Sequence, residues 1–122
     1  MKNKILLIDD DLYFREMFTE LLLRNNYEVI ELSDGRLANE YYKKYRPDVV
    51  ITDIIMPEKE GIETILDLKK ESPDIKIIAI SGGGRSNPMD NLRPAKLLGA
   101  NITFEKPFDN KEILKAIKLL ID

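Results

Sequence analysis

The feature that most constrains the fold is the order in which two kinds of segment alternate along the chain. Short apolar runs, each the length of one buried strand, alternate with segments whose apolar residues recur at helical spacing. The apolar runs occupy residues 4–9, 27–32, 48–53, 75–81 and 101–105, and the helical segments residues 12–25, 34–45, 61–72, 88–98 and 110–121. Strands that are each followed by a helix predict a parallel sheet covered by helices on both faces.

We expect an α/β fold: a doubly wound, five-stranded parallel sheet in the order 2-1-3-4-5, which is a flavodoxin-like three-layer sandwich. Right-handed crossovers between parallel strands favour this arrangement. At 122 residues the chain fits one domain with one core. We expect residues 1–122 to form that single domain, with no output domain after the last helix. Ligands of such sheets bind beyond the carboxyl ends of the strands, here between the first and third strands.

The composition excludes several classes of function. The chain has no cysteine and no histidine, which excludes disulfides, thiolate metal sites, imidazole catalysis and the usual zinc sites. Its net charge of −3 and the lack of a basic stripe argue against nucleic-acid binding. The first apolar run is too short for a signal peptide or a membrane span. We therefore expect a cytoplasmic protein with neither nucleic acid nor membrane as a partner.

Polar side chains that can do chemistry stand at the ends of the predicted strands. Three consecutive aspartates, Asp9–Asp11, follow the first apolar run, and Asp53 ends the third. Ser81 ends the fourth run, and Lys106 follows the fifth. Each pair of adjacent carboxylates at about 4 Å and an effective dielectric of about 20 costs roughly 4 kcal/mol. Either water screens these charges, or a cation belongs at this edge of the sheet.

An oxygen-rich site without histidine or cysteine favours Mg²⁺, with Mn²⁺ also possible. Magnesium held by one or two carboxylates keeps several waters and accepts a phosphate readily. A carboxylate can act as the nucleophile and form an aspartyl-phosphate. The metal and a lysine would neutralise charge on the transferred oxygens, and Ser81 could donate a hydrogen bond to one of them. Backbone N–H groups of residues 82–84 could add further hydrogen bonds.

The chain resembles the receiver domain of two-component response regulators over its whole length. The motifs that carry the resemblance occur in the family's order, at residues 9–10, 51–61 (ITDIIMPEKEG), 81 and 106–108 (Lys-Pro-Phe). The resemblance implies that Asp53 is the phosphoacceptor, Ser81 the switch hydroxyl and Lys106 a contact of the phosphoryl group. The implied metal ligands are the side chains of Asp9, Asp10 and Asp53 and the backbone carbonyl of Ile55.

The resemblance also implies partners. Receivers take the phosphoryl group from a sensor histidine kinase or a phosphotransfer protein, and they signal to an output protein. They are switches that catalyse their own phosphorylation rather than turnover enzymes. Some form homodimers through the fourth helix, fifth strand and fifth helix.

Two departures from the family pattern concern signalling rather than phosphoryl chemistry. Receivers usually carry Tyr or Phe three residues before the lysine, where this chain has Thr103. Phe104 is expected to point to the opposite face, because neighbouring strand residues alternate. The segment from residue 81 to residue 99 is longer than usual, and Pro94 predicts a short or bent fourth helix.

Two alternative functions fit parts of the pattern. A degenerate receiver would bind partners without being phosphorylated; Thr103 leaves this alternative open, whereas the intact acids and Lys106 argue against it. A phosphohydrolase of the haloacid dehalogenase type would use Asp9 as its nucleophile in an Asp-x-Asp motif. The chain lacks the Thr or Val that such enzymes carry two residues after this motif, and has Tyr13 there instead.

The first helix has a capping signal and an apolar pattern. Asp11 precedes it, and aspartate is a common N-cap. The apolar residues expected to face the core are Leu12, Phe14, Met17, Phe18, Leu21 and Leu22.

Overall fold

The computed structural model describes residues 2–54, 61–81 and 99–122. Its sheet has five parallel strands in the order β2-β1-β3-β4-β5, which confirms the predicted fold class and strand order. The strands are β1 (Lys4–Ile8), β2 (Glu28–Leu32), β3 (Val49–Asp53), β4 (Ile77–Ser81) and β5 (Ile102–Glu105).

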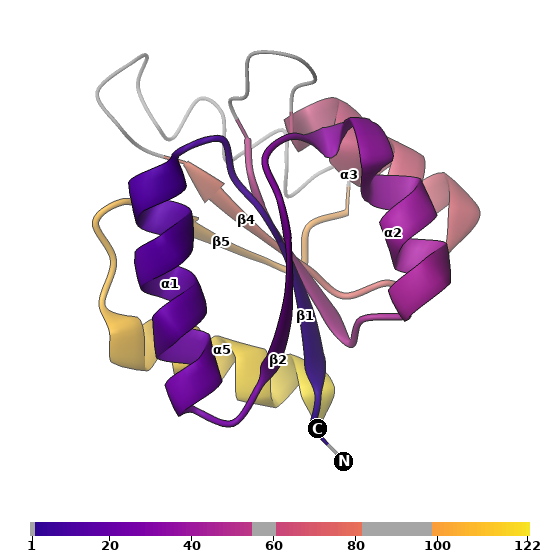
Figure 1. Cartoon of the computed structure of the whole chain (residues 1–122). Coiled ribbons are helices and arrows are strands. Elements are labelled where there is room, and N and C mark those ends of the chain that lie inside the picture. The colour runs from indigo at the N-terminus through magenta and orange to yellow at the C-terminus, as the bar shows by residue number, and fades with distance from the viewer. Residues whose placement is uncertain (1, 55–60, 82–98) are drawn as a thin grey trace.

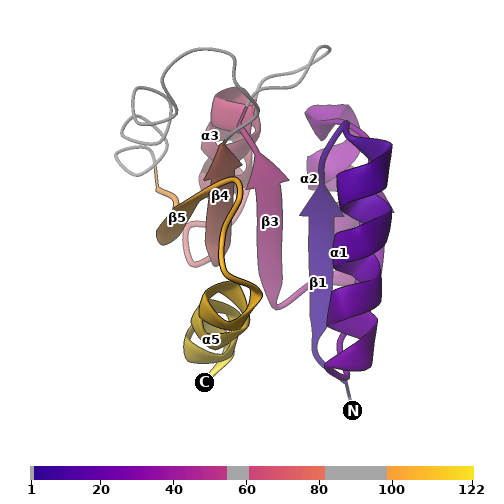
Figure 2. The same ribbon diagram turned by 90° about the vertical axis from the view of Figure 1, so that its left-hand side faces the viewer.

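Helices cover both faces of the sheet. They are α1 (Leu12–Arg24), α2 (Ala38–Tyr45), α3 (Gly61–Glu71) and α5 (Asn110–Ile121), and a short 3-10 helix (Gly35–Leu37) leads into α2. Helices α1 and α5 lie on one face, and α2 and α3 lie on the other (Figures 1 and 2). The predicted helix over residues 88–98, with its bend at Pro94, lies outside the described residues. Among the helices that are described, none has the length and apolar character needed to cross a bilayer.

The strand register brings the carboxyl ends of β1, β3, β4 and β5 to one edge of the sheet. Ile8 at the end of β1 pairs with Thr52, one residue before the end of β3. Asp53 pairs with Ile80, and Ser81 with Glu105. All strands point the same way, and the two termini lie at the end of the molecule away from these carboxyl ends (Figure 2).

Alternating side chains of the strands build a core on each face of the sheet. In β1, Ile5 and Leu7 pack on the α1 and α5 side, whereas Leu6 and Ile8 pack on the α2 and α3 side. These four side chains are at most 1% exposed. Full burial of such a side chain contributes about 1.5–3 kcal/mol. Because β1 is apolar on both faces, it fits only the middle of a covered sheet.

Helix α1 confirms the predicted cap, but its core face is narrower than predicted. The Asp11 carboxylate accepts hydrogen bonds from the backbone N–H groups of Tyr13 and Phe14. Leu12 and Met17 are 50% and 65% exposed, so the expectation that they face the core was wrong. A helix turns about 100° per residue, which places both side chains roughly 100–120° from the direction of the buried Phe18 and Leu22.

Candidate functional site

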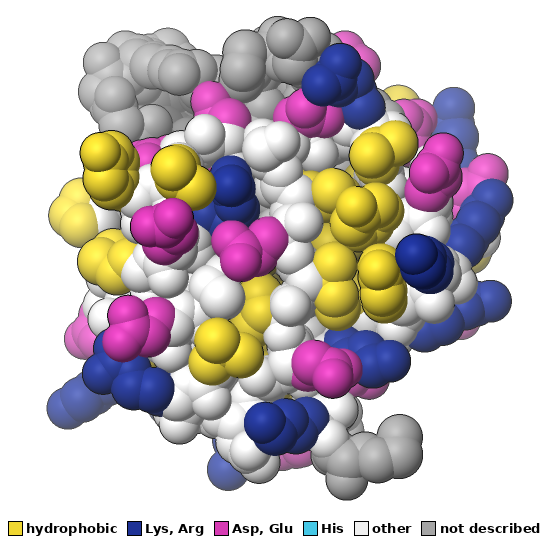
Figure 3. All heavy atoms as spheres, in the orientation of Figure 1, with side chains coloured by type: hydrophobic (Ala, Val, Ile, Leu, Met, Phe, Trp, Pro, Cys, Tyr) yellow, Lys and Arg dark blue, Asp and Glu magenta, His cyan; other side chains and the backbone are white. Residues whose placement is uncertain are grey.

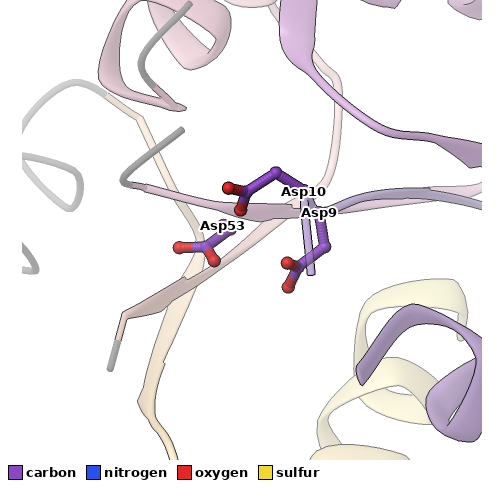
Figure 4. A group of neighbouring side chains, drawn as sticks. All are labelled: Asp9, Asp10 and Asp53. Atoms are coloured by element: carbon purple, nitrogen blue, oxygen red, sulfur yellow. The ribbon is translucent and has the colours of Figure 1, made fainter. Parts of the chain in front are cut away.

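Three aspartates come together at the carboxyl ends of β1 and β3. Asp9 and Asp10 follow β1, and Asp53 is the last residue of β3. One carboxylate oxygen from each lies within 4.8 Å of the others, and Figure 4 shows the three groups converging at the strand ends. Asp9 is buried and 1% exposed, whereas Asp10 and Asp53 are half-buried.

Asp9 is held by hydrogen bonds to both of its carboxylate oxygens. Its Oδ1 atom accepts from the backbone N–H of Asp11 at 2.9 Å, and its Oδ2 atom accepts from Lys106 Nζ at 3.0 Å. Burial raises the pKa of Asp9, and the Asp11 hydrogen bond and the Lys106 charge offset that increase only in part. The buried position therefore disfavours a charged Asp9 even with Lys106 beside it, and a second cation would favour the charged form.

Lys106 bridges two of the aspartates. Its Nζ atom lies 3.0 Å from Asp9 Oδ2 and 3.4 Å from Asp53 Oδ2. Burial lowers the pKa of Lys106, but the charges of Asp53 and Asp9 and the hydrogen bonds to them outweigh it and raise the pKa above its ordinary value. Lys106 is therefore an ammonium at neutral pH.

The backbone around Lys106 is also tied to the sheet. Its N–H donates to the carbonyl of Ser81 at 2.6 Å, and the Lys106–Pro107 peptide bond is cis. Ser81 is 1% exposed at the end of β4. Because Ser81 follows Ile80, the partner of Asp53 in the register, it lies at the same edge of the sheet as the aspartates.

The donor set fits a hard divalent cation. Three carboxylates face one ammonium, and carboxylate oxygens are the ligands that Mg²⁺ and Mn²⁺ prefer. A cation at this point would relieve the repulsion among the aspartates and the cost of burying Asp9. The backbone carbonyl of Ile55, the fourth predicted ligand, lies outside the described residues, as do residues 82–84.

Gly61 is a residue whose importance the sequence did not reveal beyond its place in a motif. Its N–H donates to the carbonyl of Ile54 at 2.7 Å. A Cβ atom at this position would lie 2.0 Å from the carbonyl oxygen of Asp53 and 2.6 Å from Cα of Ile54. Only glycine allows the start of α3 to pack this closely against the backbone of Asp53.

Arg15 is a second residue that sequence reasoning did not single out. Its Nη1 atom donates to the carbonyl of Asp9 at 2.7 Å, and its Nε atom donates to Glu31 Oε1 at 3.1 Å. Arg15 thereby joins the first turn of α1 to the end of β1 and to β2. This contact fixes the backbone of Asp9, so the carboxylate stays at the strand edge.

Phe14 is a third such residue, because the sequence showed it only as an apolar helix position. The centre of its ring lies 3.9 Å from Lys106 Nζ. The one available signal was an aromatic residue in the first turn after the aspartates. Helical periodicity indicates which face a side chain occupies, but not which charged group it meets.

The structure bears out the expected placement of Thr103 and Phe104 on opposite faces. Phe104 packs in the core on the α1 and α5 side, with its ring 5.7 Å from that of Phe108. Thr103 pairs with Ala79, whose side chain belongs to the core on the other face. Phe104 therefore does not take the place of the Tyr or Phe that receivers usually carry at the position of Thr103.

Comparisons with known proteins agree with this geometry. The family model described as "response regulator receiver domain" matches residues 5–118. The chain is 35% identical to chemotaxis protein CheY of Bacillus subtilis (strain 168) over 118 residues, which cover 96% of each chain. It is 33% identical to sporulation initiation phosphotransferase F of the same organism, covering 97% of this chain and 93% of that one.

Solved structures show the same fold. A crystal structure of a response regulator receiver domain protein from Clostridium thermocellum superimposes with a TM-score of 0.88 at 30% identity. The match covers 98% of this chain and 94% of that chain.

Proposed function

The chain belongs to the response regulator receiver domain family, and we propose that it is a phosphorylation-dependent switch of a two-component system. Asp53 accepts the phosphoryl group, and Asp9, Asp10 and Asp53 bind Mg²⁺. The protein catalyses its own phosphorylation and dephosphorylation and is not a turnover enzyme. Lys106 contacts the phosphoryl group, and Ser81 donates a hydrogen bond to it.

The observation that carries this proposal is the position of Lys106 between Asp9 and Asp53. The ammonium lies 3.4 Å from Asp53 Oδ2, where it can neutralise charge that develops on phosphoryl oxygens as they approach this carboxylate. Asp53 is half-buried rather than buried, so a donor can reach it. Asp9 is buried, and both of its oxygens already accept hydrogen bonds, which suits a metal ligand better than a nucleophile.

Magnesium would supply a Lewis acid that attracts the oxygens of the phosphoryl group. The chain's own residues do the rest. Asp9 and Asp10 would hold the cation beside Asp53, and Lys106 provides a fixed positive charge 3.4 Å from Asp53 Oδ2.

A phosphohistidine of a sensor kinase or of a phosphotransfer protein is the proposed donor. The surface beside the site suits a protein partner, since hydrophobic side chains gather at the end of α1 nearest the aspartates (Figure 3). Tyr13 and Met17, both in α1, are 83% and 65% exposed. Exposed apolar groups of this kind mark protein–protein contacts. A homodimer through helix 4, β5 and α5 remains a prediction, because residues 88–98 lie outside the described residues.

The test is intact mass after incubation with phosphoramidate and MgCl₂, followed by peptide mapping. We expect the gain of one phosphoryl group on Asp53, lost in Asp53→Ala and in EDTA. Asp74→Ala, which removes an exposed carboxylate from the segment between α3 and the start of β4, serves as the matched control and should be labelled like the wild type.

The alternatives give different results in the same experiment. An adduct on Asp9 would favour a haloacid dehalogenase-type phosphohydrolase. A folded protein that binds Mg²⁺ but gains no mass, even with a kinase-derived donor, would favour a receiver that binds partners without phosphorylation.

A further inference from the structure

All four phenylalanines of the chain form one cluster beside the aspartates. The Phe14 ring stacks on Phe18, with centroids 5.4 Å apart, and meets Phe108 edge-on at 6.0 Å. Phe108 also contacts Phe18 at 5.8 Å and Phe104 at 5.7 Å. The Phe14 ring is therefore fixed by two neighbours that themselves contact each other.

The fixed Phe14 ring lies against the ammonium of Lys106. The Nζ atom is 3.9 Å from the ring centroid, well inside the limit of about 6 Å for a cation–π interaction. The Lys106 side chain is only 19% exposed, and such interactions strengthen as the cation is desolvated. Among the described residues, the Lys106 ammonium contacts two carboxylates and one aromatic face.

A metal ion can compete for the two carboxylate contacts of Lys106 but not for its contact with the Phe14 ring. Asp9 and Asp53 are also proposed ligands of Mg²⁺, so the metal and the ammonium compete for the same oxygens. The Phe14 ring offers no ligand to Mg²⁺. Its contact with Lys106 therefore remains available when the aspartates bind the metal.

We propose that Phe14 is a positioning residue for phosphoryl transfer. Its ring keeps the Lys106 ammonium beside Asp53 when Asp9 and Asp53 bind a divalent cation. This inference rests on the proposed function. In the transfer from phosphoramidate, an Asp53 oxygen forms the bond to phosphorus as the P–N bond breaks. The nitrogen keeps the bonding electrons and leaves protonated as ammonia, and Lys106 stays an ammonium throughout.

The kinetic test compares rates of phosphorylation by phosphoramidate at saturating Mg²⁺ in three variants. Phe14→Leu keeps an apolar side chain but removes the aromatic face, and we expect its rate to fall about three- to tenfold, the size of one partly desolvated cation–π contact. Phe14→Tyr restores the face and should react within twofold of the wild type. Phe104→Leu removes a ring that contacts Phe108 in the same cluster and should leave the rate unchanged.

A spectroscopic test needs no phosphoryl donor. Protons on the ε-carbon of Lys106 should resonate upfield in the wild type because of the ring current of Phe14. Lys106→Arg identifies the signal by its loss. The upfield shift should persist when Mg²⁺ is added, remain in Phe14→Tyr and Phe104→Leu, and disappear in Phe14→Leu.

The outcomes separate this inference from the proposed function. A wild-type protein that gains no phosphoryl group on Asp53 contradicts the proposed function, and the Mg²⁺ titration by NMR still decides whether Phe14 positions Lys106. A Phe14→Leu variant that is phosphorylated as fast as the wild type overturns the inference. Loss of the upfield shift when Mg²⁺ binds to the wild type overturns it as well.

Discussion

Lys106 Nζ and Asp9 Oδ2 lie 3.0 Å apart although 97 positions separate the two residues in the chain. The contact joins the end of β1 to the residue after β5, across a sheet in which these strands are not neighbours. It places a positive charge at an edge where three carboxylates converge.

The contribution of Asp9 to the stability of the metal-free protein should fall as pH rises from the acid range and Asp9 becomes charged. Its pKa in the folded state is raised from 3.8 by burial. A raised pKa means that the folded state favours the protonated form, so this contribution is present below pH 3.8 and is lost as pH rises through the folded pKa.

The measurement is the free energy of unfolding by urea, without metal, at several pH values. Asp9→Asn, which carries no charge at any of them, should gain stability relative to the wild type as pH rises over this interval. A difference between the two proteins that does not change with pH would contradict the expectation. Adding Mg²⁺ at neutral pH should stabilise the wild type by mass action and Asp9→Asn much less.

Lys106→Met should raise the affinity of the protein for Mg²⁺ and slow the phosphorylation of Asp53. Without the ammonium, Asp9 and Asp53 no longer share their oxygens with a competing cation, so the affinity for Mg²⁺ should rise by roughly tenfold, equivalent to about 1.4 kcal/mol. Phosphorylation of Asp53 should slow by at least about tenfold, because a charge that stabilises the transferred group is gone. Isothermal titration and mass labelling measure the two effects. Lys111→Met, on the exposed side of α5, is the control and should change neither.

Gly61→Ala should impair both folding and phosphorylation. The new methyl group would lie 2.0 Å from the carbonyl oxygen of Asp53, and backbone must move to admit it. We expect a loss of about 1–3 kcal/mol in stability and slower labelling of the protein that remains folded.

Gly35→Ala provides the comparison for Gly61→Ala. Its Cβ would meet the side chain of Thr64 rather than the backbone of the acceptor. It should also destabilise the protein, as thermal unfolding would show, without slowing the labelling of folded molecules. Equal rates of labelling in the two variants would argue against a role for Gly61 at the site.

Asp11→Ala should lower the stability of the protein without affecting the site that Asp9, Asp10 and Asp53 form. Its side chain caps α1 through the N–H groups of Tyr13 and Phe14, and loss of such a cap costs about 1 kcal/mol. The hydrogen bond to Asp9 comes from the backbone of Asp11 and survives the substitution. The midpoint of urea unfolding should fall while Mg²⁺ affinity and the rate of phosphorylation stay unchanged. A large loss of metal affinity would show that Asp11 is a ligand.

Within the described residues, the elements, their order and the edge at which the polar residues meet follow from the sequence alone. Apolar runs of strand length and helical spacing are local patterns, and parallel strands connected by helices leave few topologies. The rule that ligands bind at the carboxyl ends of strands then placed Asp9, Asp53, Ser81 and Lys106 together. Asp11 was predicted as a cap because capping depends only on neighbouring residues.

Which of these residues contact one another depends on how the elements pack in three dimensions. Burial of Asp9, its pairing with Lys106 and the contact of Phe14 with that ammonium depend on strand register and on the rotation of α1 against the sheet. Periodicity assigns a side chain to a face, yet it misplaced Leu12 and Met17 and gave no partner for Phe14. Contacts between distant residues are set by the packing of whole elements, and no local pattern encodes the distance between their atoms.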